Sequence, residues 1–304
     1  MNNPTSALAR FKEKVAASPL YLLALWTLGR APGCPVSALM KAVVKEREGY
    51  AAGATVKAQS HLIEEDSDGE RWSTPYGEYW VPKRQVSSDF LFNLLGEREV
   101  QVYGGPGWNV KAGDIVIDCG ANVGTFVVEA LENGARLVVA CEPSPSNAEC
   151  LRRNFGKELS AGQVIIYPRG LWDSSTTLRL ALGDTPAGDS LTAETGDGME
   201  VPVTTIDALV AELNLERVDF VKMDIEGAER RALAGATTTI RRFHPRLAIS
   251  AYHLPDDPGA IKAVVKKAFD GYTLHCSQAR PMWNGLLHTR VAPLVYFFSA
   301  TAKA

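Results

Sequence analysis

The fold of this chain is decided by the stretch Ile115–Gly124, which reads IVIDCGANVG, and by Leu137–Pro143, which reads LVVACEP. The first apolar run predicts a buried strand, and Gly120 and Gly124 allow a sharp turn that opens a helix. Glu142 ends the second strand about 20 residues after the turn, where a carboxylate can accept hydrogen bonds from the hydroxyls of a ribose. The two stretches therefore predict a strand, turn, helix and strand unit that binds a nucleoside.

The chemistry of the turn indicates which nucleoside is bound. Dinucleotide binders carry Gly-x-Gly-x-x-Gly, whose middle glycine lets a pyrophosphate approach, and here Asn122 occupies that place. S-adenosylmethionine has a ribose and no phosphate, and its positive charges suit the carboxylates of Asp118 and Glu142. We therefore predict S-adenosylmethionine as the cofactor, bound by Asp118, Gly120, Asn122, Gly124 and Glu142. An ordinary βαβ unit without a ligand is the alternative.

A second acidic stretch, VDFVKMDIEGAE over Val218–Glu229, repeats the pattern of an apolar strand followed by acids, a glycine and a helix. Ligands of a parallel α/β sheet bind outside the carboxyl ends of its strands. We therefore expect Asp224 and Glu226 to face the same crevice as Asp118 and Glu142. The alternative is that the two acids complement the dipole of the following helix.

With both stretches in view, the chain resembles the FkbM family of S-adenosylmethionine-dependent methyltransferases. The resemblance runs from about Gly77 to about Phe298 and implies a class I methyltransferase fold. It also implies methyl transfer, usually to a hydroxyl oxygen, in the tailoring of sugars, polysaccharides or secondary metabolites. One departure is Ala292-Pro293, where such proteins often carry Glu-Thr. The matching segments are Asp118–Gly124, Glu142-Pro143, Val203–Asp207, Asp219–Glu229 and Ser250–Asp257.

The order of predicted elements indicates an α/β fold with a mostly parallel, Rossmann-like sheet covered on both faces. Its last two strands have no helix between them and should be antiparallel. The insertion 176–203 should form additional strands at the surface, which we call the β-excursion. We predict a methyltransferase domain over residues 71–304. The predicted strands are seven and lie near 114–118, 136–142, 163–167, 217–223, 247–252, 272–276 and 293–299.

Residues 1–70 are predicted to form a mainly helical N-terminal segment, with a polar loop over 51–70. The apolar run Leu20–Trp26 is too short to span a bilayer and lacks a clean signal-peptide cleavage site. Helices that pack over the catalytic domain or form a homodimer contact are the preferred interpretation, and a peripheral membrane role is the lesser alternative.

Composition favours a soluble enzyme. Apolar residues make up 46% and charged residues 22%, which is enough for a sizeable core. The net charge of −3 gives no reason to expect a nucleic acid partner. The five cysteines are odd in number and lack Cys-x-x-Cys spacing, which disfavours a disulfide framework or a zinc site and favours the reducing cytoplasm.

The predicted catalytic groups are His253, Asp224 and Glu226. His253 follows a strand, and histidine titrates near neutrality, which suits a general base for the acceptor hydroxyl. The alternative for His253 is a loop residue that caps Asp256 or Asp257.

A divalent metal site formed by Asp224, Glu226 and His253 would suit Mg²⁺ or Mn²⁺. We place it second because the spacing is not diagnostic. Asp173 follows the third strand, where methyltransferases commonly hold the adenine amino group, and its alternative is a turn residue.

The sequence thus predicts O-methylation of a small-molecule or saccharide acceptor with S-adenosylmethionine as methyl donor. Two alternatives remain. A nucleoside-binding scaffold without turnover would keep Glu142 and the turn, and an NAD-dependent oxidoreductase is disfavoured by Asn122.

Overall fold

A computed structural model describes residues 19–31, 34–83, 89–105, 107–181, 190–192, 198–284 and 287–300. Its centre is a seven-stranded sheet in the order β13-β16-β12-β11-β4-β5-β6. The strands β12, β11, β4, β5 and β6 pair in parallel, and β16 is antiparallel to both of its neighbours, β12 and β13. This topology confirms the predicted class I methyltransferase sheet. The bounds are β4 Ile115–Cys119, β5 Leu137–Cys141, β6 Val164–Tyr167, β11 Phe220–Met223, β12 Arg246–Ser250, β13 Tyr272–Cys276 and β16 Val295–Ala300.

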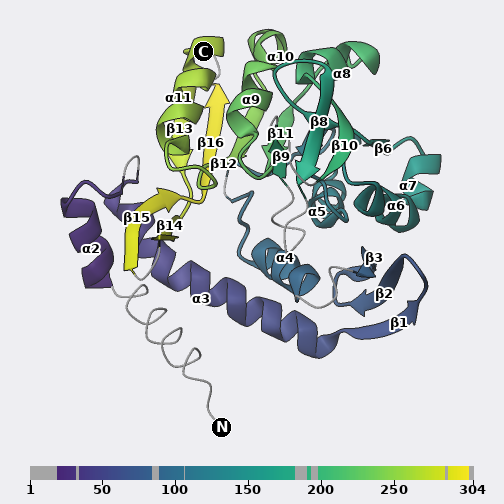
Figure 1. The fold of residues 1–304 in the computed structure, drawn as a ribbon, viewed down its shortest axis with the longest axis horizontal. Coiled ribbons are helices and arrows are strands. Elements are labelled where there is room, and N and C mark those ends of the chain that lie inside the picture. The colour runs from purple at the N-terminus through teal and green to yellow at the C-terminus, as the bar shows by residue number, and fades with distance from the viewer. Residues whose placement is uncertain are drawn as a thin grey trace.

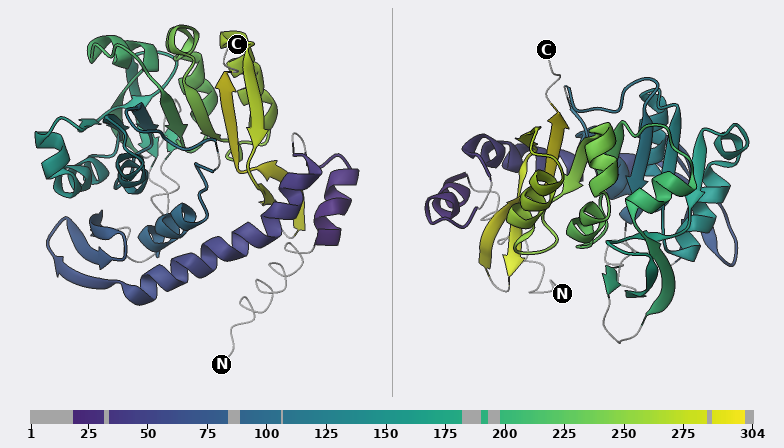
Figure 2. Two further views of the ribbon diagram at one scale, coloured as in Figure 1. Left: turned by 180° about the vertical axis from the view of Figure 1, so that it is seen from behind. Right: turned by 90° about the horizontal axis from the view of Figure 1, so that it is seen from above.

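Helices cover both faces of this sheet because its strands are apolar on both sides. Ile115 and Ile117 of β4 belong to a core shared with helices α8 to α11, whereas Val116 belongs to a core shared with α5 and α6. Figures 1 and 2 show the resulting three layers. The bounds are α5 Thr125–Glu132, α6 Pro145–Asn154, α7 Gly156–Ser160, α8 Ile206–Glu212, α9 Glu229–Ala234, α10 Thr237–Phe243 and α11 Asp257–Ala268.

Two smaller sheets interrupt the alternation of strand and helix. The predicted β-excursion is confirmed for its described residues: β7 (Gly170–Leu171), β8 (Thr176–Ala181), β9 (Ser190–Thr192) and β10 (Met199–Thr204) form a four-stranded sheet. Between β13 and β16 the chain forms a hairpin of β14 (Ala279–Asn284) and β15 (Leu287–Pro293), which the sequence analysis did not anticipate.

The N-terminal part wraps the carboxyl ends of the parallel strands. Helix α3 (Val36–Gln59) runs below the sheet in Figure 1, from the β14–β15 hairpin to a three-stranded sheet of β1 (His61–Glu65), β2 (Gly69–Thr74) and β3 (Gly77–Pro82). Helix α2 (Pro19–Thr27) precedes α3, and α4 (Phe90–Glu99) lies between α3 and the main sheet. Among the described residues, no helix combines the length and the apolar character needed to cross a membrane.

The predicted polar loop over 51–70 is wrong, because α3 continues to Gln59 and β1 begins at His61. Close packing at glycine residues explains why helix α3 continues through this part of the chain. A Cβ on Gly96 of α4 would lie 2.6 Å from the backbone oxygen of Gly49 and 2.6 Å from the backbone nitrogen of Gly53, so the glycines allow α3 and α4 to touch. Tertiary packing of this kind outweighs the low helix propensity of glycine. Strand β2 spans position 70. The predicted domain boundary between residues 70 and 71 stays a prediction, and so does the predicted homodimer contact.

Candidate active site

The glycine turn connects β4 to α5 and lies against the end of β11. Gly120, Asn122 and Gly124 have φ values of +82°, +50° and +94°. The backbone N–H groups of Gly120 and Ala121 both donate to the Cys141 carbonyl at 3.0 Å. A Cβ at Gly120 would lie only 2.1 Å from the Asp224 carbonyl oxygen, so glycine is required there. The two acidic stretches of the sequence therefore meet, as predicted.

Glu142, at the end of β5, is fixed by three donors of the protein. Its Oε2 accepts from the Asn122 N–H at 2.9 Å, and its Oε1 accepts from the Ser144 N–H at 2.9 Å and from Asn147 Nδ2 at 3.3 Å. The side chain is buried yet lines a cavity. A carboxylate at this place can accept hydrogen bonds from the hydroxyls of a ribose.

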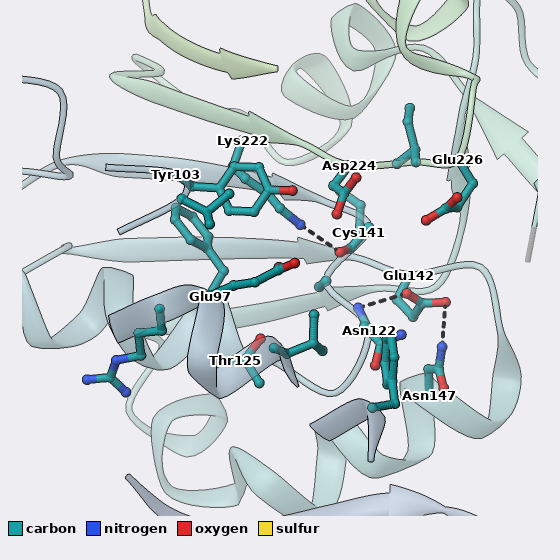
Figure 3. A pocket seen from close by; sticks show the side chains of 18 of the residues that line it. Glu97, Tyr103, Asn122, Thr125, Cys141, Glu142, Asn147, Lys222, Asp224 and Glu226 are labelled. Carbon is teal, nitrogen blue, oxygen red and sulfur yellow. Dashed lines mark hydrogen bonds between the residues drawn. The ribbon is translucent and has the colours of Figure 1, made fainter. Parts of the chain in front are cut away.

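The cavity holds about 350 Å³, within the range of small-molecule sites. Figure 3 shows Glu142, Asp224 and Glu226 at its wall, together with Glu97 of α4 and Tyr103. It brings together side chains from the glycine turn, α4, the β6–β7 segment, the β-excursion and the end of β11. The residues discussed below that line it are Glu97, Tyr103, Gly120, Asn122, Glu129, Glu142, Arg169, Leu171, Leu180, Leu191, Lys222, Asp224 and Glu226.

Asp118 lies beneath the cavity and is completely buried. Its Oδ1 is 3.1 Å from Lys222 Nζ, which also donates to the Gly120 carbonyl at 2.9 Å. Lys222 is directly opposite Asp118 in the β11–β4 register. Asp118 is not among the cavity-lining residues, so its contribution is to hold Lys222 and the turn. A direct contact between Asp118 and a ligand stays a prediction.

His253 lies behind Asp224 and Glu226 and outside the cavity lining. Its ring is only 8% exposed and is surrounded by carboxylates. Nδ1 is 2.9 Å from Glu229 Oε1, and Nε2 is 3.4 Å from both Asp224 Oδ1 and Glu226 Oε2. Glu229 is completely buried, and its two oxygens accept the N–H groups of Ile225 and Gly227 at 2.9 and 3.0 Å.

These neighbours change the proton affinities of the cluster. Burial lowers the pKa of His253, but the contacts and charges of Glu226, Glu229 and Asp224 outweigh it and raise that pKa to about 11. Burial raises the pKa of Asp224, and the positive charges of His253 and Lys222 reverse this and hold it below its ordinary value. Burial raises the pKa of Glu226. His253 as a neutral general base is therefore not favoured by this geometry, and the role stays a prediction.

Glu129 is a further titratable group of the cavity. Burial raises its pKa to about 7, and the nearby positive charge of Arg98 opposes the shift. Tyr103, whose hydroxyl lies 3.0 Å from Ser250 Oγ, has a pKa raised above its ordinary value by burial and by the negative charge of Asp224. The hydroxyl of Tyr103 therefore acts as a neutral hydrogen-bonding group.

Asp173 lies outside the cavity lining. Its Oδ2 is 2.7 Å from Arg231 Nη1, and its Oδ1 accepts from Ser174 Oγ at 3.2 Å. The predicted contact of Asp173 with adenine remains untested. Arg169 and Leu171 occupy the cavity wall at that end of the sheet instead.

Sequence reasoning missed several groups of the site. Lys222 gave a usable signal, because a lysine between apolar residues in a buried strand needs a buried acid, and Asp118 is the acid opposite it. Glu97 and Tyr103 carry no comparable signal, since they reach the cavity only through the packing of the N-terminal part. Asp224 and Glu226 were predicted to face the crevice, and they do.

The chain is similar to known methyltransferases. The family described as "Methyltransferase FkbM domain" matches residues 118–272. The 31-O-demethyl-FK506 methyltransferase FkbM of Streptomyces tacrolimicus is 28% identical over 190 residues, which cover 52% of this chain and 72% of that protein. The hexuronic acid methyltransferase AglP of Haloferax volcanii is 26% identical over 155 residues, which cover 51% of this chain and 62% of that protein.

Among solved structures, the methyltransferase FkbM from Methylobacillus flagellatus KT matches with a TM-score of 0.45 at 18% identity, over 82% of this chain and 58% of that one. SMU.1697c of Streptococcus mutans, a putative methyltransferase in complex with SAH, matches with a TM-score of 0.38 at 14% identity, over 64% and 92%. The chain thus spans less than two thirds of AglP and of the Methylobacillus protein.

Proposed function

The chain belongs to the FkbM methyltransferase family, and on that basis we propose that it transfers a methyl group from S-adenosylmethionine to a hydroxyl of a small molecule or saccharide. The proposal is supported chiefly by Glu142, whose carboxylate lies at the end of β5 against the glycine turn and lines the cavity, where a carboxylate can accept hydrogen bonds from the hydroxyls of a ribose.

The residues present fit this cofactor. Gly120 and Asn122 of the turn line the cavity beside Glu142, which can accept a ribose hydroxyl. Leu171, Leu180 and Leu191 give the cavity an apolar wall suited to a nucleobase. Asp224 and Glu226 supply negative charge suited to an ammonium or a sulfonium.

The bound cofactor would supply an electrophilic methyl group on a positively charged sulfur. Transfer of that methyl group to the acceptor oxygen would leave the C–S bonding electrons on sulfur and would release the hydroxyl proton. The protein's part is to align the acceptor oxygen and to receive that proton at a carboxylate of Asp224 or Glu226. His253 holds these two carboxylates in place, because its Nε2 lies 3.4 Å from each.

The acceptor class is inferred from relatives whose names specify it. One is described as a 31-O-demethyl-FK506 methyltransferase and the other as a hexuronic acid methyltransferase. Hydroxyl-rich acceptors suit a cavity whose wall carries Glu97, Tyr103 and Glu129, since these side chains offer hydrogen bonds to hydroxyl groups.

A thermal-shift assay tests the cofactor and a transfer assay tests the reaction. S-adenosylhomocysteine should raise the melting temperature of the protein and NAD should not, because only a ligand of the folded state stabilises it. Stabilisation by NAD alone would favour the oxidoreductase. Labelled S-adenosylmethionine incubated with the enzyme and fractionated cell extract should yield a labelled acceptor; binding with no transfer to any fraction would favour the scaffold.

A further inference from the structure

Asp224 Oδ1 and Glu226 Oε2 belong to side chains that line the cavity, and His253 Nε2 lies behind them, close to both. Nε2 lies 3.4 Å from each oxygen. Within the part of the chain that the structure describes, His253 Nε2 and Asp224 Oδ1 make no hydrogen bond of acceptable geometry, whereas His253 Nδ1 faces Glu229 Oε1 at 2.9 Å. An imidazole that is 8% exposed rarely remains in this state, because a buried polar atom without a partner costs about 1–3 kcal/mol.

Glu229 explains why the imidazole has this orientation. It is completely buried, both of its oxygens accept backbone N–H groups, and its Oε1 is 2.9 Å from His253 Nδ1. A carboxylate behind one ring nitrogen fixes the tautomer of a metal-binding histidine and directs the other nitrogen toward the ion. Atoms of Asp224, Glu229 and His253 all lie within 4.8 Å of one another, and Glu226 joins this group through the 3.4 Å distance from its Oε2 to His253 Nε2.

Backbone conformation gives a separate indication. Glu226 has a φ of +54°, a conformation that is strained for a residue with a side chain. Strain of this kind persists where the surrounding structure enforces it, often at functional sites. Figure 3 shows that the result is a Glu226 carboxylate directed toward the cavity near Asp224.

We propose that Asp224, Glu226 and His253 Nε2 bind one divalent cation of the Mg²⁺ or Mn²⁺ class at the cavity wall, with Glu229 as the buried carboxylate behind the histidine. Two carboxylate oxygens and one imidazole suit these ions, which keep several water ligands and so leave room for an acceptor oxygen. This proposal rests on the proposed function only for the identity of that acceptor. The bound cation would lower the pKa of the acceptor hydroxyl and orient it, and the hydroxyl proton would then pass to water instead of to Asp224 or Glu226, which bind the cation.

Direct binding of Mn²⁺ tests the proposal without cofactor, acceptor or turnover. The protein is stripped with EDTA, desalted and titrated with Mn²⁺, and free Mn²⁺ is followed by electron paramagnetic resonance. Wild type should bind one ion per chain, with water-exchange relaxation showing retained water ligands. Glu226→Gln should abolish saturable binding of Mn²⁺. The Glu226 side chain is 25% exposed, so the fold should tolerate this substitution. Glu229→Gln should weaken binding by about 10- to 100-fold, the usual effect of a carboxylate behind a ligating histidine.

Glu97→Gln is the matched control, an acid of the same cavity outside the cluster, and it should bind Mn²⁺ as wild type does. The proposal is overturned if folded wild type shows no saturable binding up to several millimolar Mn²⁺, or if Glu226→Gln and Glu97→Gln bind equally. Failure of S-adenosylhomocysteine to bind would refute the proposed cofactor and leave the Mn²⁺ result unaffected, so the two failures are distinguishable.

Discussion

Replacement of Glu142 by alanine should weaken the binding of S-adenosylhomocysteine without abolishing it. The Glu142 carboxylate lines the cavity and accepts protein donors, and in the proposed complex it also accepts a ribose hydroxyl, so the ligand should lose about one charge-assisted hydrogen bond. Such a bond contributes about 1.5–3 kcal/mol, and at about 1.4 kcal/mol per tenfold change the dissociation constant should rise by about 10- to 150-fold.

The same substitution should also lower the stability of the protein. It removes the acceptor for the Asn122 N–H, the Ser144 N–H and Asn147 Nδ2. Each donor left without a partner costs about 1–3 kcal/mol, less where water fills the space. We therefore expect a lower denaturation midpoint together with the weaker binding.

Isothermal titration calorimetry measures the affinity, and circular dichroism verifies that the variant is folded. Asp173→Asn is the control, because Asp173 lies outside the cavity lining and is paired with Arg231; its affinity should stay within about twofold of wild type, a difference of about 0.4 kcal/mol. Unchanged affinity in folded Glu142→Ala would remove Glu142 from the ligand site. A large loss of affinity in Asp173→Asn would instead support the predicted contact between Asp173 and the adenine of the cofactor.

Three further perturbations test other parts of the molecule. EDTA should abolish methyl transfer, and Mg²⁺ or Mn²⁺ should restore it; full activity in EDTA would show that no cation assists the reaction. Glu129→Gln should be more stable than wild type above pH 7. The folded protein raises the pKa of Glu129 from about 4.5 to about 7, so it favours the protonated carboxyl group. This contribution stabilises wild type fully below about pH 4.5 and is lost as the pH rises through about 7. At about 1.4 kcal/mol per pH unit, this interval amounts to at most about 3.5 kcal/mol. Denaturant unfolding at pH 5 and pH 8 measures most of it, and equal pH dependence of the two proteins would contradict the shift. Gly96→Ala should raise the KM for the acceptor more than it weakens S-adenosylhomocysteine binding. A Cβ at residue 96 would lie 2.6 Å from backbone atoms of α3 and would displace α4. Equal changes in the KM and in S-adenosylhomocysteine affinity would refute the assignment of α4 to the acceptor side of the cavity.

The cofactor side of the site was predictable because its signals are local. The apolar run that ends at Asp118, the two glycines and the acid at Glu142 lie within a single βαβ unit, and physical rules connect each of them to its position. Even so, sequence could not tell that Asp118 is buried under the turn and paired with Lys222, since that depends on the register of β11 against β4.

The acceptor side could not be predicted because it is built by distant packing. Glu97 and Tyr103 line the cavity only because α3 holds α4 against the sheet, through a glycine contact between residues about 40 positions apart. The same distance effect bears on the prediction for His253, which stays a prediction. A histidine after a strand is typical of a general base, but its protonation depends on Glu229, which comes from α9 and is visible as a partner only after folding.

The cluster of Asp224, Glu226, Glu229 and His253 must contain positive charge in any state. Three carboxylates around one ring would repel one another, and the partly buried position reduces the screening by water. A proton on His253 supplies one unit of charge, whereas a divalent cation beside Nε2 supplies two and requires that proton to leave. The two states therefore compete, and Mn²⁺ binding should release a proton that a pH indicator can detect in weakly buffered solution. Binding without proton release would mean that the ion is bound away from His253.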